Sequence, residues 1–360
     1  MKIAIFTSTP LTTNYGGILQ NYALQTILKQ KGHDVTTLDH QRHLKKANNT
    51  IRTILRIGNL MYNKYIETKI RTLKTRKFLN LISQKKVYID QIKENEFDVY
   101  IVGSDQVWRK EAYLDPDLAL IGFLGFTKNW NVKRIAYAAS FGVSDWRFSE
   151  EQTKECSSLI KMFDAISVRE DDGVNLCKKY LNIEAKQVLD PTLLLEKDEY
   201  IKLAKAKKSG SKIKNKLITY ILDYTSGKIE FINEIASING YTVHNTNSLT
   251  DDKKAPLYKR IQPSVEDWLS AFIDAEMIIT DSFHGTVFSI IFNKEFLVIG
   301  NNERGMSRFN SLLRCFNLED RLIKIDTYDK KNIRPIDWSI VNEKKRKLQN
   351  ESIEFLYRNL

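Results

Sequence analysis

The 360-residue sequence predicts an α/β protein in which two Rossmann-like, doubly wound domains face a cleft. Two observations predict this class. Apolar runs of the length that buried parallel strands need alternate along the chain with segments of helical periodicity. This alternating series occurs twice, and the lysine-rich stretch "KAKKSGSKIKNK" (205–216) separates the two series. We therefore expect an N-terminal domain over 1–204, a C-terminal domain over 205–335 and a C-terminal helix over 336–360.

The first series begins with an apolar strand over 2–6, which a helix over 18–30 follows. Leu19, Ala23 and Ile27 form one face of this helix, and Gly32 lies just past its end. The next strand is expected over 35–38. Further strands are predicted at "DVYIVG" (98–103), "RIAYAAS" (134–140), "AISVRE" (165–170) and "KQVLD" (186–190), with helices over 150–163 and 172–181.

The second series repeats this pattern. Strands are predicted at "LITYIL" (217–222), "YTVHN" (241–245), 275–280, 296–300 and "RLIKI" (321–325). Helices are predicted near 229–238, from Val265, over 285–293 and from Met306, and the last segment, 338–360, is a long amphipathic helix. Strands joined by helices in this way form parallel sheets, so each series predicts one doubly wound domain.

Composition limits the class of protein. A hydrophobic content of 42% and 28% charged residues are typical of a soluble globular chain. Cys156, Cys177 and Cys315 are widely spaced, which indicates neither a disulfide framework nor a zinc site. No apolar run approaches the roughly 18 residues that a membrane span requires, and the N-terminal apolar run is too short for a signal peptide. We expect a cytoplasmic protein with no metal site.

The excess of basic residues lies in one segment. Residues 41–86 contain 13 Lys and Arg and one acid, Glu67, and this excess equals the net charge of the whole chain, +12. Apolar residues between Ile51 and Phe78 recur at roughly helical spacing, which predicts one or two amphipathic basic helices inserted in the first domain. Even if their apolar stripe packs on that domain, their basic residues, among them Arg71, Lys74, Arg76 and Lys77, are expected to face outward as one patch. An anionic membrane surface is the partner that we expect for this patch. A nucleic-acid-binding face would spread its charge more widely, so no nucleic acid is expected.

One histidine lies at the joint between a predicted buried strand and a predicted buried helix. The turn is "DSFHGT" (281–286), and open α/β sheets bind ligands at such carboxyl ends of strands. The free N–H groups of the first helical turn attract anions. Gly285 would let a ligand approach the backbone, and Ser282 and Thr286 offer hydroxyl groups. The alternative is that Asp281 or Ser282 only caps the helix and that His284 is a neighbour with satisfied hydrogen bonds.

Three other strand ends or helix starts carry residues suited to ligands. Paired glycines open the first helix, a serine, an aspartate and a glutamine follow the strand 98–103, and an arginine ends the strand 165–170. The candidate binding residues are Asn14, Tyr15, Gly16, Gly17, Ser104, Asp105, Gln106 and Arg169. A guanidinium such as that of Arg169 can grip a phosphate or carboxylate as a fork. The alternative for each is ordinary turn chemistry or, for Arg169, a surface ion pair with Glu170 or Asp171.

The order of these motifs resembles the polysaccharide pyruvyl transferase family. The motifs are "NYGGILQNYALQ", "DVYIVGSDQVW", "IAYAASFG", "ISVRE", "VLDPTLLL" and "TDSFHGTVFSIIFNKEFLVIG". The resemblance implies a GT-B-like fold and transfer of pyruvate from phosphoenolpyruvate to sugar hydroxyls of a cell-surface polysaccharide, often as a ketal with release of phosphate. His284 and Arg169 would then hold phosphoenolpyruvate. Ser282 stands where one common form of the motif has an arginine, and Arg304 and Arg308 are the substitutes that we expect.

This activity implies a division of roles. Phosphoenolpyruvate must be protonated at C3 before a hydroxyl attacks C2, and His284 is the expected acid. The helix N-terminus disfavours an imidazolium, but the full charges of the bound anion are expected to prevail over it. Asp105 is the expected base, and Asp281 is expected to cap the helix or orient His284. No cofactor is expected, and the acceptor is a sugar or polysaccharide, either free of lipid or built on a polyprenyl phosphate. In the second case it would lie at the inner face of the membrane.

Two other functions remain open from the sequence. A glycosyltransferase of the same fold that uses a nucleotide sugar would share the cleft. A non-catalytic protein that binds anions or nucleic acid would account for the basic segment.

Overall fold

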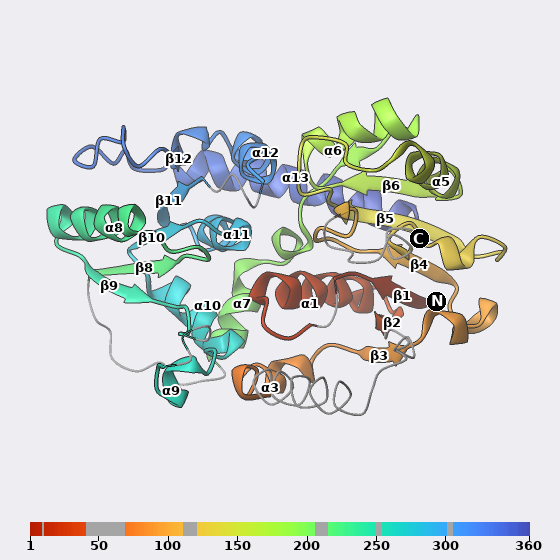
Figure 1. Ribbon diagram of the computed structural model, residues 1–360, viewed down its shortest axis with the longest axis horizontal. Coiled ribbons are helices and arrows are strands. Elements are labelled where there is room, and N and C mark those ends of the chain that lie inside the picture. The colour runs from red at the N-terminus through yellow and green to blue at the C-terminus, as the bar shows by residue number, and fades with distance from the viewer. Residues whose placement is uncertain are drawn as a thin grey trace, which may run out of the picture.

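Two parallel β-sheets lie side by side and form the framework of the protein (Figure 1). The computed structural model describes residues 1–8, 11–40, 69–110, 121–205, 215–249, 252, 254–300 and 305–360. The first sheet has seven strands in the order β3-β2-β1-β4-β5-β6-β7, and the second has five in the order β12-β11-β10-β8-β9. In each sheet the strand order runs outward from a central pair of strands, β1 and β4 in the first sheet and β10 and β8 in the second. This is the doubly wound arrangement, which places a ligand site at the carboxyl ends of the strands.

The first half of the chain supplies the seven-stranded sheet. Its strands are β1 Lys2–Phe6, β2 Asp34–His40, β3 Gln84–Val87, β4 Val99–Val102, β5 Lys133–Ala139, β6 Ala165–Val168 and β7 Lys186–Gln187. Its helices are α1 Tyr15–Gln30, α3 Arg76–Leu79, α5 Glu150–Ile160 and α6 Asp171–Leu176, which continues as a π-helical turn, Cys177–Leu181. Short 3-10 helices are η1 Ile89–Gln91, η2 Glu94–Glu96, η4 Gly125–Thr127 and η6 Pro191–Leu194.

The second half supplies the five-stranded sheet. Its strands are β8 Lys216–Tyr220, β9 Thr242–Asn245, β10 Met277–Thr280, β11 Glu295–Ile299 and β12 Leu322–Ile323. Its helices are α8 Ser226–Asn239, α9 Leu257–Arg260, α10 Val265–Asp274, α11 Phe283–Ile291 and α12 Ser307–Phe316, with the 3-10 helix η7 Glu319–Arg321. Helix α7 Lys197–Lys205 joins the halves, and α13 Trp338–Arg358 ends the chain.

The predicted class of two Rossmann-like halves is confirmed, and a strand is present at every apolar run that predicted one. The sequence missed β3, which pairs with β2 at the edge of the first sheet. This strand is only "QKKV", too short and too basic to show an apolar alternation, and Lys85 and Lys86 are exposed as edge-strand lysines often are. The expectation of a helical basic segment is therefore wrong for its last residues, 84–86. Residues 41–68 lie outside the described part of the chain.

The two halves share apolar contacts. Tyr15 of α1 stacks on Trp268 of α10 with ring centroids 5.1 Å apart, and its hydroxyl donates to the Pro263 carbonyl over 2.7 Å. Helix α7 packs on α10, and its buried Tyr200 meets Phe288 of α11 edge to face at 5.0 Å. Although α7 falls in the predicted first domain, it therefore packs on the second. The exact domain boundaries stay a prediction.

The last helix returns to the first half (Figure 1). The Tyr357 hydroxyl donates to the Ile27 carbonyl at 3.4 Å, and Gln349 Nε2 donates to the Leu194 carbonyl at 2.9 Å. Helix α13 therefore ties the end of the chain to the first half, and it also packs on α12 of the second half. Among the described helices, none combines the length and the apolar character that crossing a bilayer requires.

Candidate active site

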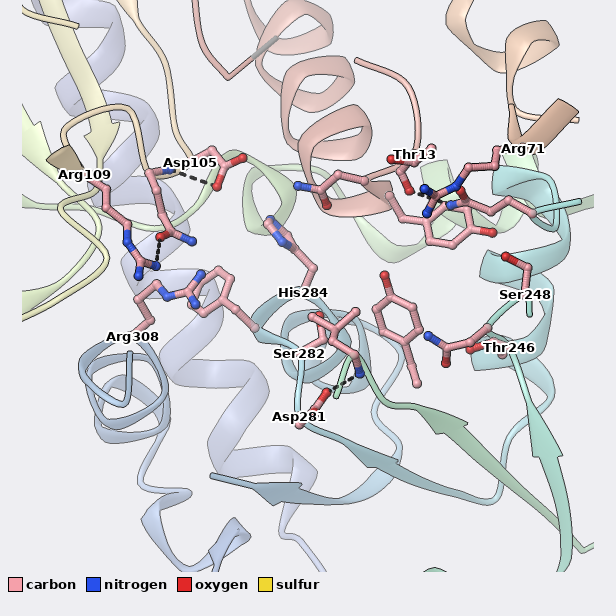
Figure 2. Close-up of a pocket in the computed structure, with 18 residues that line it drawn as sticks. Thr13, Arg71, Asp105, Arg109, Thr246, Ser248, Asp281, Ser282, His284 and Arg308 are labelled. Atoms are coloured by element: carbon pink, nitrogen blue, oxygen red, sulfur yellow. Dashed lines mark hydrogen bonds between the residues drawn. The ribbon is translucent and has the colours of Figure 1, made fainter. Parts of the chain in front are cut away.

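A cavity of about 440 Å³ lies between the halves, and turns from both of them line it (Figure 2). Seven of the predicted site residues line this cavity: Asn14, Tyr15, Asp105, Gln106, Ser282, His284 and Arg308. Six others do not line it: Gly16, Gly17, Ser104, Arg169, Gly285 and Thr286. Arg304 lies outside the described residues. Reasoning from strand ends and helix starts thus located the cavity, but it did not distinguish the residues that line the cavity from those that support them.

His284 lies in the first turn of α11, in the middle of the cavity (Figure 2). The helix begins here because Ser282 caps it, with its hydroxyl accepting the Gly285 N–H at 3.4 Å. The imidazole Nε2 is buried and lies 3.7 Å from a carboxylate oxygen of Asp190. On the other side, a Cβ added at Gly16 would lie only 1.9 Å from His284 Nδ1. The ring is therefore held between Asp190 and the start of α1.

Asp190 is the central residue that the sequence reasoning missed. Its fully buried carboxylate accepts from Ser104 Oγ at 2.8 Å, from Arg169 Nη1 at 2.8 Å and from the Thr192 N–H at 3.0 Å. Burial raises the pKa of Asp190, but His284, Arg169 and Thr192 together outweigh it and hold the pKa well below its usual range. Asp190 is therefore ionised beside the histidine. The available signal was "LDPT", in which an aspartate ends a strand and caps the turn that follows.

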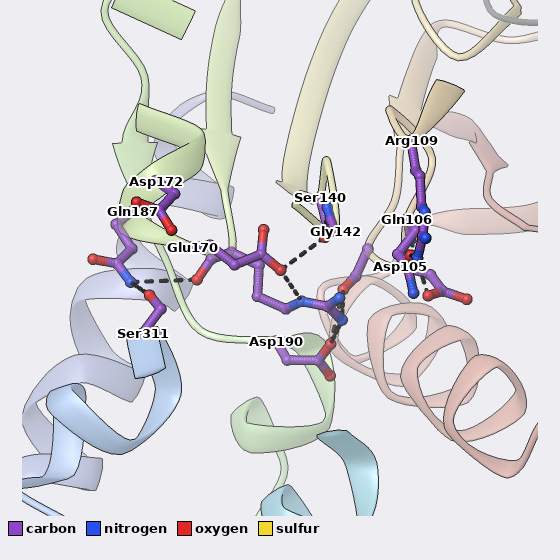
Figure 3. A network of polar contacts seen from close by, with 12 residues as sticks. Asp105, Gln106, Arg109, Ser140, Gly142, Glu170, Asp172, Gln187, Asp190 and Ser311 are labelled. Carbon is purple, nitrogen blue, oxygen red and sulfur yellow. Dashed lines mark hydrogen bonds and ion pairs between the residues drawn. The ribbon is translucent and has the colours of Figure 1, made fainter. Parts of the chain in front are cut away.

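Arg169 faces protein carboxylates. Figure 3 shows two of them, Glu170 and Asp190, within a network of polar contacts. Its Nε donates to Glu170 at 3.1 Å and its Nη1 to Asp190 at 2.8 Å, and all three side chains are at most 3% exposed. We call Arg169, Glu170 and Asp190 the buried cluster. Burial lowers the pKa of Arg169, but the charges of Glu170 and Asp190 outweigh it and raise the pKa above its ordinary value. The ion pair with Glu170 is thus buried, and the expected surface pair is wrong. Direct contact of Arg169 with a ligand stays a prediction.

A second buried arginine faces the cavity. Arg308 of α12 lines it, and its guanidinium carbon lies 5.9 Å from the centre of the Phe283 ring. Burial, followed by the charge of Arg169, lowers the pKa of Arg308 to about 10. The charged form is therefore less stable here than in water, and an anion in the cavity would stabilise it. Arg308 therefore suits the role predicted for it, which is to substitute for the arginine that one form of the family motif has at the position of Ser282.

Arg109 lies beside Arg308 and was not predicted (Figure 2). Its Nη1 donates to Gln106 Oε1 at 2.6 Å, which links it to the turn after β4. We call Arg109 and Arg308 the guanidinium end of the cavity. No local pattern marks Arg109, because it follows the "SDQVW" motif on a stretch without periodicity. Arg71 also lines the cavity, although the sequence placed it on an outward-facing basic patch.

Asp105 projects a carboxylate into the cavity from the turn after β4. Its φ of 85° lies in the left-handed region, which aspartate tolerates better than most residues. The turn is closed by Asp105 itself, whose Oδ1 accepts the Gln106 N–H at 2.9 Å and whose carbonyl accepts the Val107 N–H at 2.8 Å. The neighbouring Ser104 is fully buried and supports Asp190.

Several residues that were predicted to bind a ligand instead make contacts within their own turn or helix. A Cβ at Gly285 would lie 2.3 Å from Thr280 Oγ1, so this glycine lets α11 pack on the end of β10. The buried Thr286 hydroxyl donates to the Ser282 carbonyl at 3.1 Å. Gly17 faces Asn14, with a Cβ there 3.3 Å from Nδ2. Gly285 and Thr286 thus shape the turn that presents His284, and Gly17 belongs to the start of α1.

Asp281 does not orient His284 or cap α11. Its carboxylate accepts the Leu222 N–H at 2.6 Å, the Asp223 N–H at 3.1 Å and Lys228 Nζ at 2.7 Å. It therefore fixes the turn after β8 against the turn after β10. The expected role of Asp281 as a cap or as a partner of the histidine is wrong, because these three donors occupy its carboxylate.

Metal ligands do not gather at this site. Among the described residues, no group of three His, Cys, Asp or Glu side chains could hold an ion. The expectation that the reaction needs no metal stays a prediction from the sequence.

Comparison with known proteins identifies the sequence family and the fold. A profile of the family described as polysaccharide pyruvyl transferase matches residues 14–303. Arabidopsis thaliana UGT89C1 complexed with UDP-L-rhamnose has a TM-score of 0.51 and 8% identity, over 99% of this chain and 96% of that one. Anabaena HepE in complex with UDP has a TM-score of 0.50 and 10% identity, over 99% and 100%. None of the curated proteins is a significant match. At these identities the structural similarity shows the GT-B-like fold alone.

Proposed function

The chain belongs to the polysaccharide pyruvyl transferase family, and from this premise we propose that it transfers pyruvate from phosphoenolpyruvate to sugar hydroxyls. The observation that carries the proposal is the position of His284, between an ionised buried aspartate and a cavity with two guanidinium groups at one end. Such a site combines a proton donor with a place for an anion. Both are what phosphoenolpyruvate needs.

The guanidinium end is suited to the donor. Phosphoenolpyruvate carries a phosphate and a carboxylate, and the planar guanidinium groups of Arg109 and Arg308 can each donate two parallel hydrogen bonds to such a group. The pKa of Arg308, lowered to about 10, leaves it protonated at neutral pH, and an anion bound beside it would stabilise this form. The N-terminal turn of α11 adds backbone N–H groups beside the same place.

His284 donates the proton that starts the reaction. The ionised Asp190, 3.7 Å from Nε2, favours a positive charge on the ring, and a bound phosphate would favour it too. Transfer of a proton from the imidazolium to C3 turns the vinyl group into a methyl group and makes C2 electrophilic. A sugar hydroxyl then bonds to C2, and its proton passes to Asp105.

Phosphate leaves in the second half of the reaction. The bond between C2 and the phosphate oxygen breaks, and a second hydroxyl of the same sugar bonds to C2 and completes a ketal. Asp105, which lines the cavity from the turn after β4, passes the proton of the first hydroxyl to the leaving phosphate, and the neutral His284 takes the proton of the second hydroxyl, which restores its imidazolium. The products are a pyruvylated sugar and inorganic phosphate, with no change of oxidation state in a cofactor.

Phosphate release tests this function. The protein is incubated with phosphoenolpyruvate and galactosyl, glucosyl and mannosyl acceptors, and we expect phosphate release that depends on an acceptor and needs no nucleotide. Transfer from a nucleotide sugar without consumption of phosphoenolpyruvate would assign the glycosyltransferase alternative. Binding of phosphoenolpyruvate without turnover of any acceptor would favour a non-catalytic anion-binding protein.

We also propose that the protein attaches reversibly to an anionic membrane surface. Lys74, Arg76 and Lys77 are exposed, as is 59% of Leu73. Basic residues near an anionic surface contribute about 1 kcal/mol each, and an exposed leucine adds apolar contact. Arg71 is excluded from this patch because it lines the cavity. Flotation with anionic vesicles at low salt should recover the protein, and replacing the three basic residues by Gln should reduce recovery; equal recovery with neutral vesicles would contradict the attachment.

A further inference from the structure

The cavity has a second cationic end that the proposed donor does not use. Arg109 and Arg308 lie on one side of His284, and Arg71 lies on the opposite side with Thr246 and Ser248 (Figure 2). Phosphoenolpyruvate must place its C3 at His284, and its two anionic groups belong to one small molecule. Both can be held at the guanidinium end. Arg71 then faces the part of the cavity that the acceptor must occupy.

The Arg71 end is a built part of the site. Gln262 is buried between the halves, and its backbone N–H donates to the Arg71 carbonyl at 3.1 Å. Its side chain Nε2 donates to the Thr13 carbonyl at 2.5 Å. The hydroxyl of Tyr15 donates to the adjacent Pro263 carbonyl. Gln262, a residue of the second half, thus holds the backbone both at Arg71 and at Thr13. The backbone of Arg71 is therefore fixed against the second half.

The other walls of this end offer polar groups. Thr13, Thr246, Asn247 and Ser248 line it, each with a hydroxyl or amide side chain. Asn247 Oδ1 accepts the Ile221 N–H at 3.2 Å, which leaves Nδ2 as the donor that this amide can offer a ligand. Arg71 has a polar contact of its own, but a guanidinium has five N–H donors and can hold a ligand beside another partner.

We propose that the acceptor is a sugar joined to a phosphate, with the phosphate at the Arg71 end and the reacting hydroxyls toward His284. A neutral sugar needs no guanidinium, whereas the several oxygens of a phosphate match a guanidinium surrounded by hydroxyl and amide groups. This inference rests on the proposed pyruvyl transfer, and it adds the chemical class of the acceptor. Arg71 is a binding residue in this account and takes no part in proton transfer.

Matched acceptors test the inference. Galactose, glucose and mannose 1-phosphates are compared with the methyl glycosides and the uronic acids of the same sugars, with phosphoenolpyruvate at saturation. For the preferred sugar, we expect kcat/KM to be about 10- to 100-fold higher for the 1-phosphate than for the methyl glycoside or the uronic acid. This is the range that hydrogen bonds to a charged group contribute. Arg71→Gln should remove this advantage by raising KM for the sugar phosphate. Arg76→Gln, which removes the same group from an exposed position of the same segment, should change neither.

Equilibrium titration separates the inference from the proposed function. The sugar phosphates are titrated into the wild-type protein and into Arg71→Gln without phosphoenolpyruvate. Binding that weakens at least about tenfold in Arg71→Gln supports the phosphate subsite, even if phosphoenolpyruvate proves not to be the donor. Equal kcat/KM for phosphate and methyl glycoside, a preference for the uronic acid, an equal loss for all acceptors in Arg71→Gln, or no binding of any sugar phosphate would each overturn it. If the subsite holds, comparing a sugar 1-phosphate, a nucleoside diphosphate sugar and a polyprenyl diphosphate sugar identifies the source of the phosphate.

Discussion

Two buried arginines near one phenylalanine ring differ in how their surroundings change their pKa values. The guanidinium carbon of Arg169 lies 4.2 Å from the centre of the Phe283 ring, and that of Arg308 lies 5.9 Å from it. In the buried cluster, Glu170 and Asp190 raise the pKa of Arg169 despite its burial. At the guanidinium end of the cavity, burial and the charge of Arg169 lower the pKa of Arg308 to about 10.

The difference shows how one site can combine a rigid support with a place for an anion. The carboxylates around Arg169 compensate its charge inside the protein, so this arginine can hold Asp190 and, through it, His284 in position. Around Arg308, burial and the charge of Arg169 disfavour the charged form, so an anion bound in the cavity would stabilise it. Burial alone therefore does not tell a supporting arginine from a ligand-binding one, and the local charge balance does.

The largest effect is expected from breaking the buried cluster. Asp190→Asn leaves Arg169 with one carboxylate fewer in the interior, and losing one partner of a buried ion pair costs about 3–5 kcal/mol. Denaturant unfolding measures this loss. Asp145→Asn is the control, because it breaks a surface pair with Arg147 and should cost at most about 1 kcal/mol. Equal, small losses for both would show that Asp190 does not stabilise the cluster.

The loss in Asp190→Asn should depend on pH in one direction. The folded-state pKa of Asp190 lies below that of the unfolded chain, which is about 4. Its stabilising contribution is therefore complete above about pH 4 and is lost as pH falls through the depressed folded pKa. The difference between wild type and Asp190→Asn should stay constant from pH 7 to about pH 4 and shrink below it.

His284→Gln tests whether the histidine, which lies between the buried cluster and the cavity, affects the rate of turnover more than the stability of the fold. The ring contacts Asp190 on one side and lines the cavity on the other. We expect turnover to fall at least about a hundredfold, the usual scale for loss of a general acid, while the midpoint of thermal unfolding stays close to that of wild type. Near-normal turnover in a folded variant would remove His284 from the mechanism.

Gly16→Ala tests whether the position of the ring matters. The new Cβ would lie 1.9 Å from His284 Nδ1, so the ring must move, and a displacement of about 1 Å can cost up to about a hundredfold in rate. Gly17→Ala is the matched control in the same helical turn, where the nearest side-chain atom, Asn14 Nδ2, would lie at 3.3 Å. It should retain turnover within a few-fold. Equal turnover of the two variants would show that the ring tolerates displacement.

Arg308→Gln sharpens the comparison between the arginines. Removing the guanidinium should raise the dissociation constant of phosphoenolpyruvate about 10- to 100-fold. Calorimetric titration measures the binding. Arg314→Gln, on the exposed side of the same helix, is the control and should bind as wild type does. The same titration on Arg169→Lys tests whether Arg169 also touches the ligand.

Most of the fold could be predicted from the sequence because buried parallel strands and covered helices leave long apolar patterns. Strand β3 could not, since its pairing with β2 depends on backbone hydrogen bonds that a four-residue basic stretch does not reveal. His284 and Asp105 were found because the carboxyl ends of strands meet at one edge of a sheet. Arg308 was found as a substitute for the arginine that the family resemblance led us to expect at Ser282. Asp190 and Arg71 were missed for a common reason. Their roles come from residues distant in the chain, Ser104 for Asp190 and Gln262 for Arg71, and no local spacing encodes such contacts.

A crystal structure of the protein with phosphoenolpyruvate tests the central claim most directly, namely that the guanidinium end receives the donor beside His284. We expect oxygen atoms of the phosphate or carboxylate within about 3 Å of Arg308 nitrogens, C3 facing the His284 ring, and Arg169 still bonded to Asp190. Phosphoenolpyruvate bound at the Arg71 end, or held by an Arg169 that has left Asp190, would contradict the account.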